Sequence, residues 1–274
     1  MTVKELYEQG ILMLMGGESP KIDARAILEH LLKIDFGKLP LYLGESARDI
    51  SEEYFRLISE RKAGKPLSYI TGKKEFFSRN FHVREGVLIP RPETENLVSA
   101  VLERMSKETV TIADLCSGSG CIGITISLES GRRVDLYELS PDAIAISREN
   151  AEQLGANVTV SQMDVLNDEL PKTYDVIVSN PPYIPLSDMQ YLMTDVVDYE
   201  PEMALTDGGD GLIFYRRLTE LAKKHLSDGG ILAVEIGINQ HLLVAEILKS
   251  LGKPEIITDY FGVERVVLVK KGVF

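Results

Sequence analysis

The fold is decided at an apolar run, Tyr174-Asp175-Val176-Ile177-Val178-Ser179, which is followed directly by Asn180-Pro181-Pro182-Tyr183. The run is short, β-branched and bounded by polar residues, which predicts a buried parallel strand. Open α/β sheets bind their ligands beyond the carboxyl ends of such strands. Each proline fixes its own φ and lacks an N–H, so residues 180–183 form a stiff turn with free carbonyl oxygens. A proline-rich turn that only closes a strand is the ordinary alternative.

The side chains of this turn suit a planar group that bears an NH2. Asn180 offers amide donors and an acceptor, and Tyr183 adds a flat ring with a hydroxyl. We therefore predict that residues 180–183 form a clamp at the edge of the sheet.

Strand-like and helix-like segments alternate from residue 110 onward. Ser140 as N-cap and Pro141 at the first helical position mark one helix start clearly. The order predicts an α/β fold, with a Rossmann-like, doubly wound and mainly parallel sheet and a C-terminal antiparallel hairpin. Expected strands cover 110–115, 133–137, 157–161, 174–179, 230–235, 255–260 and 265–270, and expected helices cover 120–128, 141–154, 211–226 and 240–251.

The first 75 residues have a helical pattern. Thr2 and Glu5 match a capping box, Pro20 opens a second helix, and a third is expected from near Ser51 to Gly64. We interpret residues 1–75 as a small helical domain that recognises the substrate. A cap that only stabilises the fold is the alternative.

A short segment separates this helical domain from the main domain, residues 96–274. Alternating residues on either side of Ser78-Arg79 predict a hairpin, and prolines flank Arg91 before the next helix. We interpret residues 76–95 as a hairpin linker that holds Arg91 and Glu93 near the main domain.

The net charge of −12 arises entirely beyond residue 109. Residues 1–109 carry 17 basic and 17 acidic groups, whereas residues 110–274 carry 13 and 25. No Lys or Arg occurs from Thr173 to Tyr215, the stretch that contains the clamp. Nucleic-acid binding normally needs a basic footprint, so we expect no nucleic-acid partner, although a separate basic face would supply that contact.

The composition argues against a membrane protein, a secreted protein and a metal-binding protein. No apolar stretch nears the roughly 20 residues of a membrane span, and the N-terminus does not resemble a signal peptide, so we expect a cytoplasmic protein with no membrane contact. Cys116 and Cys121 are poorly spaced for a disulfide, and four scattered histidines offer no ligand spacing. We therefore expect no metal site.

A glycine-containing loop follows the first expected strand: Asp114-Leu115-Cys116-Ser117-Gly118-Ser119-Gly120. Glycines between a strand and a helix let a ligand approach the backbone closely, which is a weak nucleotide-site signal by itself. Asp114 would repel a pyrophosphate. A carboxylate is better matched to an ammonium or a sulfonium group.

Two further acidic residues follow the next two expected strands. Glu138 can accept hydrogen bonds from both hydroxyls of a ribose, although a favourable charge at a helix N-terminus is its ordinary alternative. Asp164 can accept from an adenine amino group, with Val165 beside the ring, although such an Asp is more often a turn residue. Three acidic positions without a phosphate-binding Lys or Arg suit adenosine without phosphates, and S-adenosylmethionine fits that description.

These features resemble class I S-adenosylmethionine-dependent methyltransferases that act on amino groups. The resemblance covers essentially the whole chain. It departs at Cys116-Ser117, where glycine and threonine are usual, and at Cys121, but these residues are small and we expect the cofactor site to be kept. Further segments are similar to the release-factor glutamine methyltransferases, the HemK/PrmC family: Pro66-Leu67-Ser68-Tyr69-Ile70-Thr71-Gly72, residues 87–95, Glu200-Pro201-x-x-Ala204-Leu205, Asp207-Gly208-Gly209-Asp210-Gly211-Leu212 and Phe214-Tyr215-Arg216.

The resemblance implies methyl transfer from S-adenosylmethionine to the side-chain amide nitrogen (N5) of the glutamine in the Gly-Gly-Gln motif of class-1 peptide chain release factors. S-adenosylhomocysteine is the product. Catalysis would rest on Asn180, Pro181 and Tyr183, and substrate binding on these three and Pro182. The implied cofactor-binding residues are Asp114, Cys116, Ser117, Gly118, Ser119, Gly120, Glu138, Asp164, Val165 and Asn180.

Two alternatives stay open from the residues themselves. An adenine or guanine amino methyltransferase that acts on nucleic acid shares the clamp. A non-catalytic module, with a cofactor-dependent sheet domain and a partner-binding helical domain, is the alternative from another class.

Overall fold

The computed structural model describes residues 1–273 and divides them into two compact units. The helical unit comprises Met1–Lys73 together with Met193–Tyr199. The sheet unit comprises Lys74–Leu192 and the chain from Glu200 onward. In this division residues 76–95 group with the sheet unit, and a short return segment, 193–199, groups with the helices.

The helical unit is built from amphipathic helices around one apolar core. The capping box forms at the start of α1, where Glu5 N donates to Thr2 Oγ1 (3.3 Å) and Thr2 N donates to Glu5 Oε2 (2.8 Å). Leu6, Ile27 and Tyr54 are fully buried in the core. The helices are α1 (Val3–Met13), α2 (Pro20–Leu32), α3 (Ser51–Lys62), α4 (Leu67–Thr71) and α8 (Thr194–Tyr199), with 3-10 turns at Leu39–Leu41 and Arg48–Ile50.

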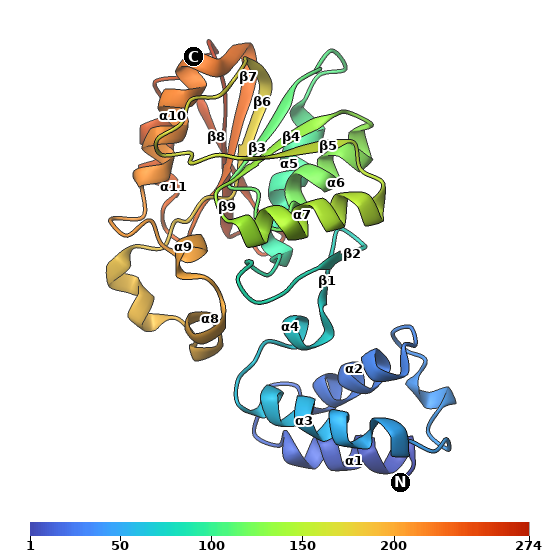
Figure 1. Ribbon diagram of the computed structural model, residues 1–274. Coiled ribbons are helices and arrows are strands. Elements are labelled where there is room, and N and C mark those ends of the chain that lie inside the picture. The colour runs from blue at the N-terminus through green and yellow to red at the C-terminus, as the bar shows by residue number, and fades with distance from the viewer. Residues whose placement is uncertain (274) are drawn as a thin grey trace. The chain divides into compact units, whose positions relative to one another are not determined.

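The sheet unit contains the predicted seven-stranded sheet, in the order β5-β4-β3-β6-β7-β9-β8 (Figure 1). Neighbouring strands are parallel except at β9, which is antiparallel to both β7 and β8. The Rossmann-like sheet with its C-terminal hairpin is thus confirmed. The strands are β3 (Ile112–Leu115), β4 (Val134–Glu138), β5 (Val158–Gln162), β6 (Tyr174–Ser179), β7 (Leu226–Glu235), β8 (Pro254–Thr258) and β9 (Glu264–Lys270).

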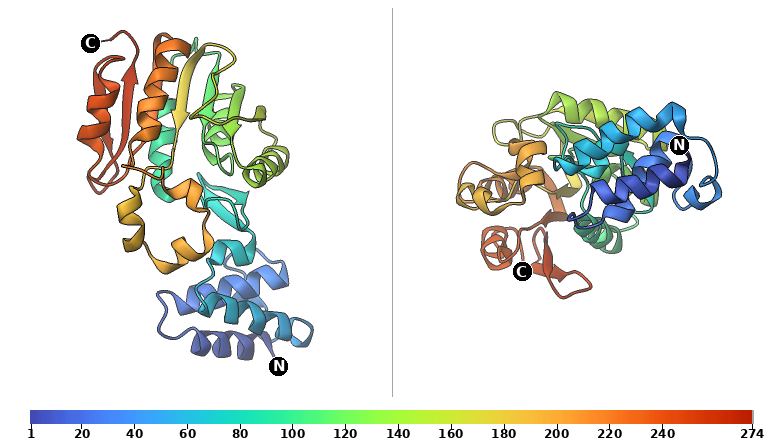
Figure 2. Two further views of the ribbon diagram at one scale, coloured as in Figure 1. Left: turned by 60° about the vertical axis from the view of Figure 1, so that its left-hand side comes forward. Right: turned by 90° about the horizontal axis from the view of Figure 1, so that it is seen from below.

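Helices cover both faces of this sheet (Figures 1 and 2). Alternation along β6 places Val176 and Val178 in the core with α5, α6 and α7, whereas Ile177 faces α10 and α11. The predicted hairpin forms from β1 (Lys73–Phe76) and β2 (Arg79–His82). It adds Phe76 and Phe81 to the core that contains Val176 and Val178. The helices are α5 (Glu95–Arg104), α6 (Cys121–Ser130), α7 (Pro141–Leu154), α10 (Ile213–His225) and α11 (His241–Leu248).

The strand order creates a switch point between β3 and β6. The chain runs outward from β3 to β4 and β5, and then returns to place β6 on the other side of β3. Ligands in doubly wound sheets bind in the crevice that such a reversal opens at the carboxyl ends of the strands. The loops after β3, β4, β5 and β6 therefore converge there.

Several short elements carry no periodic signal and were not predicted. They are α4, α8, α9 (Glu202–Leu205) and 3-10 turns at Pro92–Thr94 and Leu186–Tyr191. β7 also begins earlier than expected, at Leu226. Across residues 1–273, no helix combines the length and apolar character that a bilayer crossing demands.

Candidate functional site

A cavity of about 280 Å³ lies in the sheet unit at the switch point. Seven of the predicted site residues line it, from the loops after four strands: Cys116, Gly118, Glu138, Asp164, Val165, Asn180 and Pro182. Its other lining residues are Gly86, Val87, Leu88, Tyr137, Leu139, Ser140, Ala143, Met163, Leu166, Pro201, Met203, Ala204, Thr206, Asp207 and Phe214. No Lys or Arg is among these 22 positions.

The loop after β3 is tightly wound. Cys116, Gly118 and Gly120 have φ of +59°, +55° and +80°. A Cβ at Gly120 would lie 2.6 Å from the Ser147 hydroxyl, so this glycine is required by packing as well as by φ. Ser117, Ser119 and Gly120 are buried and do not line the cavity, so from this loop only Cys116 and Gly118 reach it.

Asp114 lies beneath this loop, fully buried and outside the cavity lining. Its Oδ2 accepts from Gly123 N (2.9 Å), while Oδ1 has no hydrogen-bond partner within the described part of the chain. Burial raises the pKa of Asp114 to about 8, because little solvent or hydrogen bonding stabilises the charge. An orphaned carboxyl oxygen at this depth suits a cationic ligand group above it.

Glu138 closes the same loop from the end of β4. Its Oε2 accepts from Gly118 N (2.7 Å), and its Oε1 accepts from Leu139 N (2.8 Å) and Ser140 N (2.9 Å). These three bonds fix the carboxylate at the cavity wall. Oε1 already accepts two of these bonds, whereas Oε2 accepts one, so Oε2 can still accept from a ligand hydroxyl.

Asp164 combines the ligand-facing and the turn role. It lines the cavity, and its carboxylate accepts from Leu166 N (3.0 Å) and Asn167 Nδ2 (2.7 Å), which closes the turn after β5. Val165, beside it, is buried in the cavity wall.

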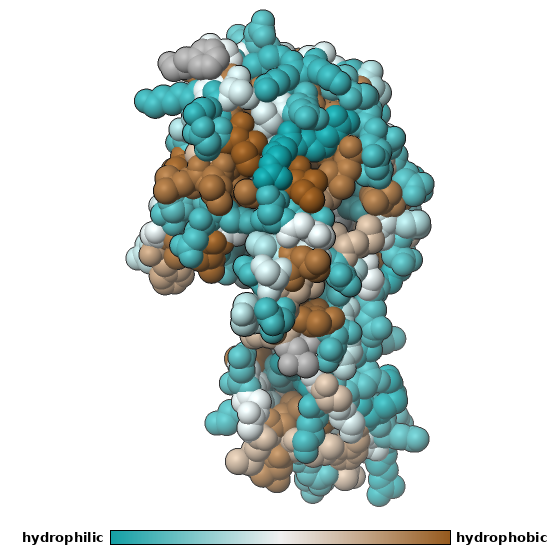
Figure 3. Space-filling model, turned by 90° about the vertical axis from the view of Figure 1, so that its left-hand side faces the viewer, coloured by the Kyte–Doolittle hydropathy of each residue, from teal (hydrophilic) through white to brown (hydrophobic). Residues whose placement is uncertain are grey.

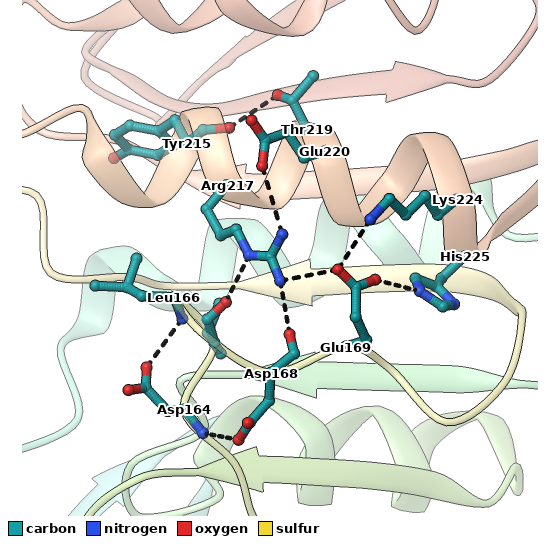
Figure 4. A network of polar contacts seen from close by, with 11 residues as sticks. Asp164, Leu166, Asp168, Glu169, Tyr215, Arg217, Thr219, Glu220, Lys224 and His225 are labelled. Carbon is teal, nitrogen blue, oxygen red and sulfur yellow. Dashed lines mark hydrogen bonds and ion pairs between the residues drawn. The ribbon is translucent and has the colours of Figure 1, made fainter.

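Arg217 of α10 holds this turn from behind (Figure 4). Its Nε donates to Val165 O (3.1 Å) and its Nη2 donates to Asp168 O (2.7 Å). Glu169 accepts from Arg217, Lys224 and His225, which together hold the pKa of this carboxyl at about 2. The sequence offered no signal for Arg217, since the contact joins elements about 50 positions apart.

The clamp, residues 180–183, leaves β6 at the cavity edge. Pro181 and Pro182 are buried, whereas Asn180 and Tyr183 are half-buried. Asn180 Nδ2 donates to Thr94 Oγ1 (3.3 Å), and the Tyr183 hydroxyl donates to Glu235 Oε1 (3.4 Å). Burial raises the pKa of Tyr183 above its usual value, so the hydroxyl stays protonated. The structure therefore brings Asn180 and Pro182 into the cavity wall, whereas Pro181 and Tyr183 are not among its lining residues.

A segment with no predicted chemical role completes the cavity. Residues 86–88 and five residues between Pro201 and Asp207 line it. The buried Glu200 joins the two segments, because it accepts from Ile89 N (3.3 Å) and pairs with Arg91 Nη2 (2.5 Å). Arg91 thus fastens the two segments together. Asp207 accepts from three backbone N–H groups between 209 and 213, and the Asp-Gly-Gly run was the available signal for that turn.

Family models match two parts of the chain. Residues 93–217 match the methyltransferase small domain, and residues 5–72 match the PrmC N-terminal domain. A methyltransferase from Pyrococcus furiosus has the same fold, with a TM-score of 0.55 and 19% identity over 81% of this chain and 99% of that chain. Fold, site and family model define the class: the chain is an S-adenosylmethionine-dependent methyltransferase.

Relatives that align with nearly the whole chain show which family of methyltransferases it belongs to. Release factor glutamine methyltransferases from Clostridium acetobutylicum and Neisseria gonorrhoeae are 40% and 39% identical, over 91% and 92% of this chain and 91% and 93% of theirs. The chain belongs to the release factor glutamine methyltransferase family.

Fold similarity alone does not choose the substrate. The catalytic domain of hMettl16, solved in complex with an MAT2A 3'UTR hairpin, has a TM-score of 0.59 to this chain at 17% identity, over 76% of this chain and 81% of that chain. Likeness of fold therefore leaves the acceptor open, and the acceptor is argued from the site.

Proposed function

We propose that this methyltransferase transfers a methyl group to the side-chain amide nitrogen of a glutamine in a class-1 peptide chain release factor, within its Gly-Gly-Gln motif. The observation that carries the proposal is the clamp at the cavity edge, with Asn180 and Tyr183 each hydrogen-bonded to a buried partner. Family membership supports the choice of acceptor, and the absence of Lys and Arg from the cavity lining supports an uncharged acceptor group over a phosphate backbone.

The site suits S-adenosylmethionine because Glu138 and Asp164 line the cavity, and because Asp114, buried outside the lining at the start of the adjoining loop, has a carboxyl oxygen without a hydrogen-bond partner among the described residues. Glu138 would hold the ribose hydroxyls, Asp164 and Val165 would hold the adenine, and residues 116–120 would contact the amino-acid end. When bound, the cofactor supplies an electrophilic methyl group. Asn180, which lines the cavity and belongs to the clamp, would lie between the cofactor and the acceptor.

The clamp would act chiefly by orientation. An amide nitrogen is a poor nucleophile because its lone pair is delocalised into the carbonyl group. Asn180 Oδ1 and the Pro181 carbonyl oxygen would accept hydrogen bonds from the two N–H groups of the acceptor amide. The Tyr183 ring would pack on the plane of that amide. Fixed acceptors aim the nitrogen and stabilise N–H groups that become more acidic during transfer.

Asn180→Ala tests this assignment. We expect turnover of release factor to fall at least about 100-fold, while the Kd for S-adenosylmethionine from isothermal titration stays within about threefold. The matched control is Asn80→Ala, an exposed asparagine on the β1–β2 hairpin, which should behave as the unchanged protein. Near-normal turnover by the Asn180 variant would contradict the clamp model.

A labelling experiment decides between acceptor classes. The enzyme is incubated with labelled S-adenosylmethionine and, in parallel, a release factor, ribosomal RNA and DNA. We expect label only in the release factor, at its glutamine. Label in RNA or DNA would support the nucleic-acid alternative, and no label in any acceptor would support the non-catalytic one.

We further propose that the helical unit recognises the release factor. Exposed apolar side chains interrupt its polar surface, as Figure 3 shows for one face, and Phe36 and Leu41 are each 79% exposed. Phe36→Asp and Leu41→Asp should raise the KM for release factor without changing the cofactor Kd. Phe261→Asp is the control, because Phe261 is an aromatic residue of the sheet unit that is 87% exposed. An unchanged KM in both helical-unit variants would leave this unit a purely stabilising role.

A further inference from the structure

We propose that Gln240 is a positioning residue of the clamp, because its side chain fixes the peptide group on which the clamp ends. The inference rests on the function proposed above and adds a residue that neither the clamp motif nor the cavity lining contains. Gln240 follows β7 and occupies the N-cap position of α11, where its side chain forms no capping bond. Its amide group is used elsewhere in the sheet unit.

The Gln240 amide group joins three loops by hydrogen bonds that use both of its ends. Its Nε2 donates to the Tyr183 carbonyl oxygen (2.8 Å) and to the Gly211 carbonyl oxygen (3.4 Å), and its Oε1 accepts from Gly237 N (2.9 Å). Two carbonyl acceptors at one end and an N–H donor at the other fix the amide in a single orientation. Since Tyr183 is the last residue of the clamp, one of these bonds reaches the clamp directly.

The peptide group between Tyr183 and Ile184 is held from both sides. Its carbonyl oxygen accepts from Gln240, and its N–H, that of Ile184, donates to the Leu205 carbonyl oxygen (3.0 Å). The two prolines of the clamp fix their own φ, and the strand before the clamp is paired on both sides in the sheet. Because the entry and the middle of the clamp are already stiff, the direction of its last peptide group depends on the bond from Gln240.

Two glycines leave the space that this arrangement requires. A Cβ at Gly211 would meet the Tyr183 carbonyl oxygen and would lie 2.9 Å from Gln240 Nε2. A Cβ at Gly237 would lie 2.8 Å from Gln240 Oε1. Contacts this short would force the glutamine amide or the clamp to shift. Gln240 and the two glycines therefore form one packed group around the end of the clamp.

Positioning of this kind acts on the rate of transfer and not on cofactor binding. If the bonds from Gln240 are lost, the last peptide group can rotate, which moves the Tyr183 ring and the Pro181 carbonyl oxygen relative to the acceptor amide. Misplacement of a reacting group by about 1 Å can cost about 100-fold in rate. Glu138 and Asp164 lie on other loops, after β4 and β5, and their own hydrogen bonds do not involve Gln240.

Gln240→Met is the first test, because methionine has nearly the same length and lacks the amide. At saturating cofactor and release factor, kcat should fall about tenfold or more, while the Kd for S-adenosylmethionine stays within about threefold. The matched control is Gln153→Met, which should leave kcat unchanged. Gln153 is an exposed glutamine on α7, and its Nε2 also donates to a backbone carbonyl oxygen, that of Asn80 (3.5 Å).

Two glycines of one loop test the same contact without changing Gln240. Gly211→Ala places a methyl group against the Tyr183 carbonyl oxygen, whereas the new methyl group of Gly208→Ala meets nothing within 4 Å. The two glycines have φ of +77° and +73°, so both variants carry a similar backbone strain. Gly208→Ala therefore shows what strain alone does to kcat, and only Gly211→Ala should lower kcat about tenfold or more.

Amide hydrogen exchange measures the contact independently of turnover. In Gln240→Met the N–H groups of Gly237 and Ile184 should exchange about three- to tenfold faster, because the first loses its acceptor and the second belongs to the released peptide group. Unchanged exchange at Ile184 would overturn the inference.

Three kinetic results would also overturn it: a kcat of Gln240→Met within about twofold of the unchanged enzyme, a parallel loss of cofactor affinity, or equal kcat values for Gly211→Ala and Gly208→Ala. Failure of the unchanged enzyme to methylate release factor would overturn the proposed function instead. The exchange rates would still decide whether Gln240 holds the clamp.

Discussion

Asp114 should make the free protein less stable as pH rises. The folded chain raises the pKa of this carboxyl from 3.8 to about 8, so the folded state binds the proton more tightly than the unfolded state does. Its contribution is fully favourable below about pH 4 and is lost as pH rises toward 8. Within that window the free energy of unfolding falls by about 1.4 kcal/mol per pH unit, or roughly 3 kcal/mol between pH 5 and pH 7.

Asp114→Asn removes this titration and keeps an oxygen that can accept from Gly123 N. We compare the free energy of unfolding of the variant with that of the unchanged protein. This difference should be about 3 kcal/mol larger, in favour of the variant, at pH 7 than at pH 5. Glu235 also has a raised pKa, about 7, and adds a slope of the same sign to both proteins, so it cancels in the difference.

Urea unfolding without cofactor, at pH 5, 6 and 7, measures this difference. Asp188→Asn, an exposed carboxyl in the same unit, is the control and should follow the unchanged protein. The reasoning is refuted if the stability difference between Asp114→Asn and the unchanged protein is the same at pH 5 and pH 7 within about 1 kcal/mol.

Three further predictions concern the cofactor site. Glu138→Gln should raise the Kd for S-adenosylmethionine about 10- to 100-fold in isothermal titration, because charge-assisted bonds of about 1.5–3 kcal/mol are lost; a change below threefold would contradict its role. Arg217→Met should raise this Kd about 3- to 10-fold with kcat nearly unchanged, and Arg217→Lys should recover part of the loss; an altered kcat at constant Kd would contradict a supporting role for the turn. Gly120→Ala should lower Tm clearly, because the new methyl group meets a serine hydroxyl at 2.6 Å. Gly118→Ala, with nothing within 4 Å, should lower Tm by only a few degrees, and equal losses would show that φ alone matters.

Most of the regular elements followed from local sequence. Thr2 and Glu5 form the expected capping box, Ser140 caps α7, and the alternating segments become the expected strands. These features depend on residues within about four positions of one another, or on a period that the sequence displays directly. Residues at strand ends were also predictable as a group, because parallel strands end at one edge of a sheet.

The partners of those residues came only from the tertiary structure. Glu235 beneath the clamp, Arg217 behind the turn after β5, and Glu200 between Ile89 and Arg91 are joined to their partners across 49 to 111 positions. No local pattern encodes such a pairing, because the order of strands in the sheet decides which distant side chains meet. The amino-acid sequence by itself therefore determined the elements, the sheet class and the residues at the strand ends. The tertiary structure decided which buried groups support them, since burial and long-range packing exist only once the chain has folded.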